Sequence, residues 1–233
     1  MDLLVFAPHP DDAEIGLGGA IARHTAEGYS VGIVDLTAGE LSSNGTPEVR
    51  QREAEEAAGV LGVACRENLD WPDGGIANTP ALVRSAVETI RRHRPQAVAV
   101  PHWNDRHPDH VRASDVLTSA AFATGLRRYQ ADGEPWRPDW ICYYFINDSV
   151  PPSFVVDVSA HYEKKWSALA CYRSQFTPAV TGGPVATRLN APTFRTLIES
   201  RDSQFGALAG VAFAEGVVVR EPVQRATLLK RTS

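Results

Sequence analysis

Cysteine is scarce in this sequence, and so are long apolar runs and excess positive charge. The three cysteines, Cys65, Cys142 and Cys171, lie far apart and form no C-x-x-C pair, so neither a disulfide framework nor a cysteine metal site is indicated. No apolar run approaches the roughly 18–20 residues that span a bilayer. The 23 basic and 28 acidic side chains give a formal charge of -5, which provides no overall attraction to nucleic acid or to an anionic membrane. We therefore expect no nucleic-acid partner, no membrane association and a reducing, cytoplasmic location.

The length and composition are those of an ordinary globular domain. The chain has 233 residues, and single domains usually have about 50–250. Hydrophobic residues make up 43% of the chain and charged residues 22%, which excludes disorder as the dominant state. Residues 1–6 carry neither a basic segment nor a cleavage site, a pattern typical of a strand rather than of a signal peptide.

Strand-like apolar runs alternate with helical spacing over about the first 125 residues. Strands are expected at residues 3–7, 31–36 and 97–100, with a short extended piece near residues 68–70. Helices are expected between and after them, at residues 15–27, 48–61, 81–93 and 110–125. This alternation predicts an α/β fold, a Rossmann-like and mostly parallel sheet with helices on both faces.

From about residue 126 the pattern is less regular. Strands are expected at residues 141–146 and 154–158, helices at 160–172 and 193–205, and an edge strand at 217–219. No repeat, low-complexity tract or linker divides the chain. Residues 1–233 are therefore expected to form a single domain.

Two loops that follow predicted strands carry residues suited to chemistry. Residues 8–14 read Pro-His-Pro-Asp-Asp-Ala-Glu, and residues 102–110 end in His-Pro-Asp-His. Ligands bind at the carboxyl ends of the strands in such a sheet, so both loops should meet at one edge. The carboxylates gathered there would repel one another. A divalent cation removes that repulsion.

His9 and Asp12 are spaced so that both side chains can face one point, and His110 completes a set of nitrogen and oxygen ligands. Three protein ligands leave a coordination position open for water, as in catalytic zinc sites. Imidazole and carboxylate favour Zn2+, with Fe2+, Mn2+ or Co2+ as alternatives. We therefore expect a single zinc ion per chain, held by His9, Asp12 and His110.

The same residues have a plainer interpretation. Asp11, Asp12 or Asp109 taken alone would be expected to cap a helix, and His107 alone would be a surface histidine beside a proline. Two separate loops that each present His-Pro-Asp with a further ligand are hard to explain by capping. The metal site is therefore the preferred interpretation.

At these loops the sequence resembles the PIG-L/LmbE-like family of zinc-dependent N-acetylglucosaminyl deacetylases. The family pattern is (A/P)-H-P-D-D after a strand and H-P-D-H downstream, and both stand here, at residues 8–12 and 107–110. Four further segments look like the bacillithiol-pathway branch, whose members remove acetate from N-acetyl-alpha-D-glucosaminyl L-malate: residues 40–46, 105–110, 172–176 and 214–216. The resemblance covers most of the chain. It implies a small glycoside as substrate and a homo-oligomer, with hexamers among the family's assemblies.

Carried over residue by residue, the resemblance implies the same three metal ligands. It makes Asp11 the general base, His107 the residue that assists the tetrahedral intermediate, and Asp109 the residue that orients His107. The expected substrate contacts are Arg50, Asp73, Asn44 and Arg106. A planar guanidinium suits bidentate capture of a carboxylate, so Arg50 is expected to bind the malate. The alternative for Arg50 is a solvated helix charge paired with Glu53 or Glu55.

Other functions compete with this interpretation. In a nucleotide-binding oxidoreductase, Gly16, Gly18 and Gly19 would cradle the pyrophosphate and Asp35 would bind the ribose, although Ile21 stands where the third Gly belongs. An iron oxygenase with two histidines and a carboxylate shares the ligand set, but its usual setting is an all-β barrel. A sugar-binding domain without activity would make no use of an open metal position. Deacetylation of another N-acetylated sugar conjugate, such as a mycothiol-type precursor, stays open on the same scaffold.

Overall fold

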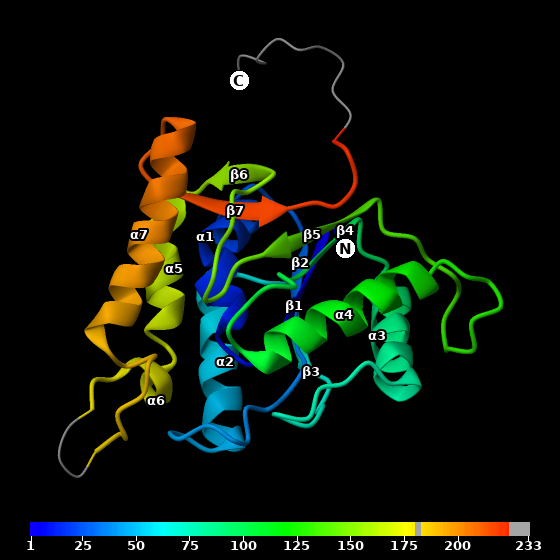
Figure 1. Cartoon of the computed structure of the whole chain (residues 1–233), viewed down its shortest axis with the longest axis horizontal. Helices are drawn as coiled ribbons and strands as arrows, with labels where there is room; N and C mark the ends of the chain where they lie inside the picture. The colour runs from blue at the N-terminus through cyan, green and yellow to red at the C-terminus, as the bar shows by residue number, and fades with distance from the viewer. Residues whose placement is uncertain (180–182, 224–233) are drawn as a thin grey trace.

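A seven-stranded sheet forms the centre of the molecule in the computed structural model, which describes residues 1–179 and 183–223 (Figure 1). The strands are β1 (Leu3–Ala7), β2 (Val31–Asp35), β3 (Cys65–Asn68), β4 (Ala97–Pro101), β5 (Trp140–Tyr144), β6 (Phe154–Asp157) and β7 (Ala214–Val218). Their order across the sheet is β3-β2-β1-β4-β5-β7-β6. The pairs from β3 to β5 are parallel, and β7 runs antiparallel to both β5 and β6. The expected α/β class is confirmed.

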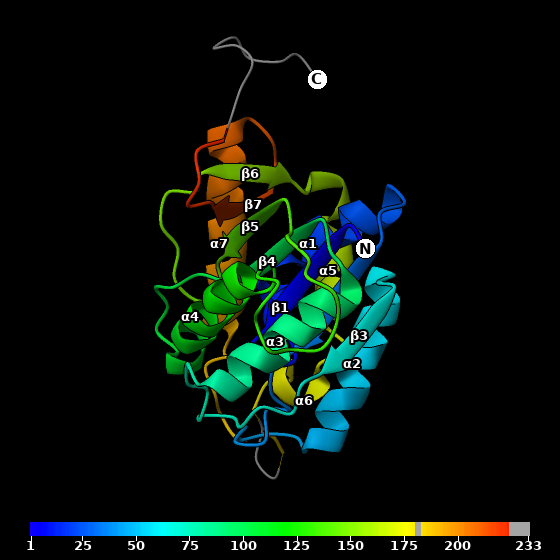
Figure 2. The ribbon, with the colours of Figure 1, turned by 90° about the vertical axis from the view of Figure 1, so that its right-hand side faces the viewer.

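Helices cover both faces of the sheet (Figure 2). One face carries α1 (Asp12–Ala26), α2 (Pro47–Leu61), α5 (Tyr162–Leu169), the short α6 (Arg173–Phe176) and α7 (Pro192–Ala209), and the other carries α3 (Pro80–His93) and α4 (Pro108–Ala123). Successive side chains of a strand point to opposite faces. In β1, Val5 and Ala7 therefore join the core beneath α1, whereas Leu4 and Phe6 join the core beneath α3 and α4. No helix among the described residues is long and apolar enough to cross a bilayer.

The topology brings the two motif loops together. Strand β1 pairs with β2 on one side and with β4 on the other, with Leu3 opposite Val31 and Ala97. The chain leaves β1 toward β2 and leaves β4 toward β5, so the two connections diverge at the β1–β4 pair. Such a switch point is where open α/β sheets bind their ligands. Residues 8–14 and 102–110 lie at this point because they follow β1 and β4.

The strand at the end of the chain differs from the sequence prediction. Residues 217–219 were expected to form an edge strand, but β7 begins at Ala214 and lies between β5 and β6. The charge of Glu215 hid the first part of this strand. Its carboxylate is buried, pairs with the buried Lys165 at 2.7 Å, and accepts the backbone N–H groups of Gly19 and Ala20 in α1. A charged residue can occupy a central strand when its partners are buried with it.

Three helix boundaries also differ. The helix expected at residues 160–172 is divided into a 3-10 turn (Ser159–His161) and α5, which ends at Leu169. Helices α1 and α4 begin at Asp12 and Pro108, earlier than expected. Pro108 suits the first helical position because it lacks the N–H that would have no partner there. Both early starts place motif residues within the first helical turn, where the backbone fixes their direction.

Candidate active site

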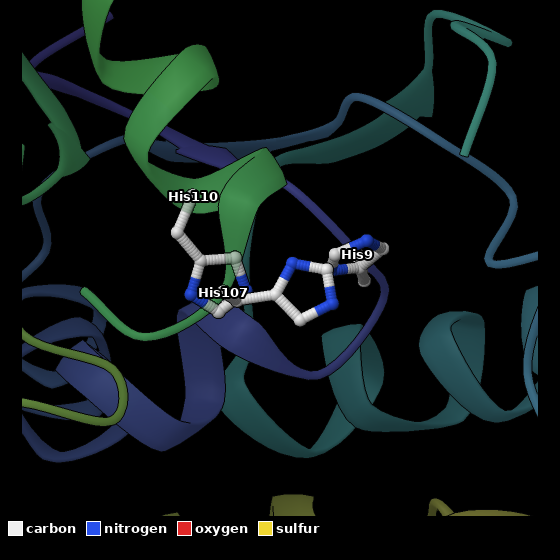
Figure 3. Close-up of side chains that lie close together, drawn as sticks. All are labelled: His9, His107 and His110. Carbon is white, nitrogen blue, oxygen red and sulfur yellow. The ribbon is translucent and has the colours of Figure 1, made fainter. Parts of the chain in front are cut away.

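Three histidines gather where the loop after β1 meets the start of α4 (Figure 3). His9 comes from the loop, whereas His107 and His110 come from the N-terminal end of α4. The ring centroids of His107 and His110 are 4.7 Å apart, and those of His9 and His107 are 4.8 Å apart. The two loops predicted to meet at one sheet edge therefore do so.

The carboxylate of Asp12 lies between His9 and His110. Its Oδ2 atom is 3.1 Å from Nδ1 of His9 and 3.2 Å from Nε2 of His110. Donor atoms bound tetrahedrally to zinc at its usual bond lengths are about 3.3 Å apart. All three residues are buried. Their donor types, and the distances from Asp12 to each histidine, suit a divalent cation, with His9 Nδ1, Asp12 Oδ2 and His110 Nε2 as the atoms that would hold it.

Each of these two histidines also has carboxylate neighbours at its other ring nitrogen. Nε2 of His9 is 3.1 Å from Oδ1 of Asp73 and 3.4 Å from Oδ2 of Asp109. Nδ1 of His110 is 3.0 Å from Oδ1 of Asp105. Metal-binding histidines usually place the ring nitrogen that does not bind the metal against such a group, which fixes the ring and makes the ligand more basic. This pattern is a second reason why the residues fit a metal.

Two groups in the described part of the chain have donor atoms that all lie within 4.8 Å of one another, and the set of His9, Asp12 and His110 is not one of them. One consists of His9, His107 and His110, and the other of His9, Asp73 and Asp109. In the first, Nδ1 of His107 already accepts the backbone N–H of Asp109 at 3.2 Å. In the second, Asp73 and Asp109 contact the nitrogen of His9 that faces away from Asp12. The set with Asp12 at its centre uses both histidines that have a carboxylate at their other ring nitrogen.

The electrostatics of the site favour positive charge at its centre. Burial alone would lower the pKa of His110, but Asp12 and Asp105 raise it to about 9. Burial likewise opposes the charge of His9, yet Asp109, Asp12 and Asp73 hold the pKa of His9 well above its usual value. A divalent cation is a stronger source of the same positive charge.

Asp11 has a strained backbone and a buried carboxylate. Its φ of 120° is unusual for a residue other than glycine, and such strain persists where surrounding contacts hold it. Nη2 of Arg50 supplies those contacts, to Oδ2 of Asp11 at 3.1 Å and to the carbonyl oxygen of Pro10. Burial raises the pKa of Asp11 to about 7, against the opposing charge of Arg50. A carboxylate with a pKa near neutrality is suited to accept and return a proton.

The capping interpretation of the aspartates does not hold. Asp11 occupies the N-cap of α1, but its side chain makes no capping hydrogen bond. The Asp109 carboxylate accepts the N–H of Gly74 at 2.7 Å, and the N-cap acceptor of α4 is the ring of His107. Helix ends therefore do not account for these residues.

His107 is the exposed member of the histidine cluster. Its Nδ1 accepts the backbone N–H of Asp109, so in the neutral ring the proton lies on Nε2. Burial and the neighbouring His110 lower the pKa of His107. Asp109 thus contacts His107 through its backbone, whereas its carboxylate faces His9. Asp109 was expected to orient His107, and the contact available for this is the hydrogen bond from its backbone N–H to Nδ1 of His107.

Three of the four expected substrate residues, Arg50, Asp73 and Arg106, line a cavity beside the histidines, and the fourth, Asn44, does not. A cavity of about 480 Å³ is lined by His9, Asp11, Asp12, Arg50, Asp73, Arg106, His107 and His110. Asn44 lies outside this lining, because its side chain pairs with the backbone of Val185 at 2.7 and 2.8 Å. The side chain of Arg50 is only 4% exposed and also donates to Ser42. Arg50 therefore holds Asp11 through Nη2, while its buried Nε has no hydrogen-bond partner among the described residues, and the malate contact expected of it stays a prediction.

Several lining residues were not predicted, among them Ser42, Asn147, Gln175 and Arg188. Asp105 was also missed, although it lies within the second motif loop. Its carboxylate accepts the N–H groups of His107 and Asn147 in addition to approaching His110. Its place two residues before His107 was the available signal, because an aspartate so placed can accept a backbone N–H in a turn.

Replacing Asp105 by Asn should weaken metal binding about 10- to 100-fold, because the variant removes the negative charge beside His110. Competition with a chromogenic chelator measures the affinity. Asp115→Asn, which changes an exposed carboxylate of α4, the helix that carries His110, is the matched control and should bind metal like the wild type. Unchanged affinity in Asp105→Asn would show that Asp105 only stabilises the loop.

The features that favoured a nucleotide-binding oxidoreductase have other uses. Arg66 binds both carboxylate oxygens of Asp35 at 2.7 and 2.8 Å, so Asp35 is not available to a ribose. The glycines of α1 permit close packing: a Cβ added to Gly16 would meet the Tyr144 ring at 2.3 Å, and one added to Gly19 would meet Val158 at 2.7 Å. The α/β fold likewise differs from the barrel of the iron oxygenases.

The chain is similar to proteins of known activity. The family model described as PIG-L, GlcNAc-PI de-N-acetylase, matches residues 4–121, which include both motif loops. A diacetylchitobiose deacetylase of Thermococcus kodakarensis is 30% identical over 230 residues, which cover 92% of this chain and 81% of the relative. The 1D-myo-inositol 2-acetamido-2-deoxy-alpha-D-glucopyranoside deacetylase 2 of Saccharopolyspora erythraea is 30% identical over 252 residues, which cover 82% of this chain and 89% of the relative. The solved structure of a conserved protein from Thermus thermophilus matches with a TM-score of 0.88 and 41% identity, over 99% of this chain and 100% of that chain.

Proposed function

This chain belongs to the PIG-L family of de-N-acetylases, and from that membership we propose its substrate, its metal and the roles of its residues. It is a hydrolase that deacetylates N-acetylglucosamine-containing substrates. The proposed substrate is N-acetyl-alpha-D-glucosaminyl L-malate, the bacillithiol precursor. The observation that supports this reaction is that Asp11, Asp12, His9 and His110 are buried together and line a cavity about 480 Å³ in volume.

The proposed metal is Zn2+, one ion per chain, held by His9, Asp12 and His110. When bound, Zn2+ would lower the pKa of water and polarise the amide carbonyl. Imidazole and carboxylate donors also accept Fe2+, Mn2+ or Co2+, so the native ion is part of the proposal. The family's metal dependence and the donor set of this site support it.

Asp11 and His107 carry the proton transfers in the proposed reaction. Asp11 takes a proton from the attacking water as the new C–O bond forms, and it returns that proton to the nitrogen as the C–N bond breaks. Acetate and a free amine are the products. His107, neutral and protonated on Nε2, donates a hydrogen bond to the carbonyl oxygen as negative charge develops there. Arg50 keeps the Asp11 carboxylate in place through its contacts with Asp11 and Pro10.

The names of the relatives give the competing substrates. The names of the two relatives contain diacetylchitobiose and the inositol glycoside of N-acetylglucosamine. Each of these compounds presents the same acetamido sugar with a neutral aglycone. The arginines that line the cavity favour an anionic aglycone instead.

We also propose a homo-oligomer in the cytoplasm. Exposed aromatic side chains support the assembly: Phe122 is 65% exposed and Trp140 is 38% exposed, and such side chains are common at subunit interfaces. The three cysteines are free thiols, which is typical of a reducing compartment.

Amine release from three conjugates tests the substrate. We expect kcat/KM to be at least about tenfold higher for N-acetylglucosaminyl-malate than for diacetylchitobiose or the inositol glycoside, since one charged contact is worth about that much. Faster turnover of a neutral conjugate would overturn the malate assignment and retain the deacetylase. Release from none of them would overturn the proposed residue roles as well.

A further inference from the structure

The cavity is lined by side chains of both charges. Its lining includes the carboxylates of Asp11, Asp12 and Asp73, and two further lining residues, Arg106 and Arg188, are cationic and exposed. Neither arginine forms an ion pair with any residue in the described part of the chain. Most other arginines near the site are occupied, since Arg50 holds Asp11 and Arg66 holds Asp35 and Glu14. A ligand in this cavity would therefore meet two guanidinium groups that have no ion-pair partner in the described part of the chain.

The segment that carries Arg188 is held in place by side chains. Asn44 forms two hydrogen bonds with the backbone of Val185, one through each side-chain atom, at 2.7 and 2.8 Å. Asn190 donates to the same Val185 carbonyl at 2.9 Å and accepts the N–H of Thr187 at 2.8 Å. Gln175 in turn donates to the Asn44 carbonyl at 2.8 Å. Residues 185–190 are thus held by side-chain hydrogen bonds, and two of them, Arg188 and Leu189, line the cavity.

The position of Arg188 on this wall is defined as well. Its guanidinium carbon lies 5.8 Å from the centre of the Phe194 ring, at the start of α7, a distance at which a cation is attracted to an aromatic face. Phe194 also lines the cavity. The planar guanidinium of Arg188 therefore lines the cavity, and its donors form no hydrogen bond with the described residues.

We propose that Arg188 joins Arg106, a substrate contact that the family resemblance already implies, in an anion subsite that binds the carboxylate groups of the substrate's aglycone. The inference rests on the proposed deacetylase function and names the residues that select among its substrates. A guanidinium binds a carboxylate through two parallel hydrogen bonds, and two arginines match a dicarboxylic aglycone such as malate. Asn44 is then a positioning residue that acts through residues 185–190, not a substrate contact.

The test compares a charged and an uncharged glycoside. The substrates are N-acetylglucosaminyl-malate and methyl N-acetyl-alpha-glucosaminide, and the variants are Arg188→Gln, Arg106→Gln and Asn44→Ala. Arg188→Gln should lower kcat/KM for the malate conjugate about tenfold or more, through KM, and should lower it less than about threefold for the methyl glycoside. Arg106→Gln should lower the same ratio, and Asn44→Ala should lower it by a smaller factor. Arg52→Gln, which changes an exposed arginine of α2 outside the cavity lining, is the matched control and should leave the ratio unchanged.

Ionic strength provides an independent readout. Salt screens exposed charges, so the KM of the wild type for the malate conjugate should rise with added salt, and Arg188→Gln should flatten that dependence. Equal losses on both substrates, or a selectivity ratio unaffected by Arg188→Gln, would overturn the anion subsite. If the wild type deacetylates neither glycoside, the proposed function is wrong. This outcome is distinguishable from failure of the anion subsite, because it is seen in the wild type, before any variant is measured.

Discussion

Replacing Asp11 by Asn should lower kcat for deacetylation about 10²- to 10⁴-fold, the usual contribution of a general acid–base group. The amide side chain has nearly the same shape as the carboxylate, but it cannot accept the proton of the attacking water. Asp11 is not among the three residues that fit the metal, so the variant should keep its metal. Steady-state amine release and elemental analysis of the same sample measure the two quantities.

The loss in Asp11→Asn has to be separated from a structural effect, because Asp11 also pairs with Arg50. Thermal unfolding and the zinc content should match those of the wild type within error. A pH profile adds a second check: the pKa of Asp11 is raised to about 7, so wild-type activity should fall as the pH decreases below that region, and the residual activity of the variant should not follow the same curve. Full activity in Asp11→Asn would exclude Asp11 as the base.

Replacing Asp12 by Ala should abolish both metal binding and catalysis. Asp12 lies between His9 and His110, within 3.2 Å of both, and the variant leaves only two imidazole ligands. Loss of the cation removes several kcal/mol of transition-state stabilisation, which corresponds to about 10³-fold or more in rate. The metal content should fall from about one ion per chain to a small fraction, as measured by elemental analysis of dialysed protein.

Thermal unfolding distinguishes this loss of metal from misfolding. A ligand that binds only the folded state stabilises it by about 2.7 kcal/mol at a concentration 100 times its dissociation constant. Added Zn2+ should therefore raise the Tm of the wild type and of Asp11→Asn, but not that of Asp12→Ala. A zinc-dependent rise of equal size in Asp12→Ala would show that the ion binds elsewhere.

Most of the sheet and the central residues of the site follow from local sequence. Leu3–Ala7 and Ala97–Pro101 are short apolar runs followed at once by polar motifs, so the rule that ligands bind at the carboxyl ends of parallel strands places His9 and His110 at one edge. His9, Asp11 and Asp12 lie within four consecutive residues, so the sequence alone indicates that their side chains belong to one site. Contacts between residues close in sequence need no knowledge of the tertiary fold.

The features that were missed depend on contacts between distant segments. Strand β7 was mispredicted because Glu215 looks like a surface residue until Lys165, 50 positions away, is seen to neutralise it. Arg50 has the chemistry of a substrate ligand, and only the folded structure shows that its Nη2 is bound to Asp11 and Pro10. Arg188 has no motif around it, and the segment that carries it is hydrogen-bonded at Val185 to Asn44, which is far away in the sequence.

Anomalous diffraction at the zinc edge, from crystals of active protein, tests the metal centre most directly. The peak is predicted within bonding distance of Nδ1 of His9, Oδ2 of Asp12 and Nε2 of His110, with a single peak in each chain. A peak on the opposite nitrogen of His9, beside Asp73 and Asp109, or a fully active crystal with no peak at this edge, would contradict the account.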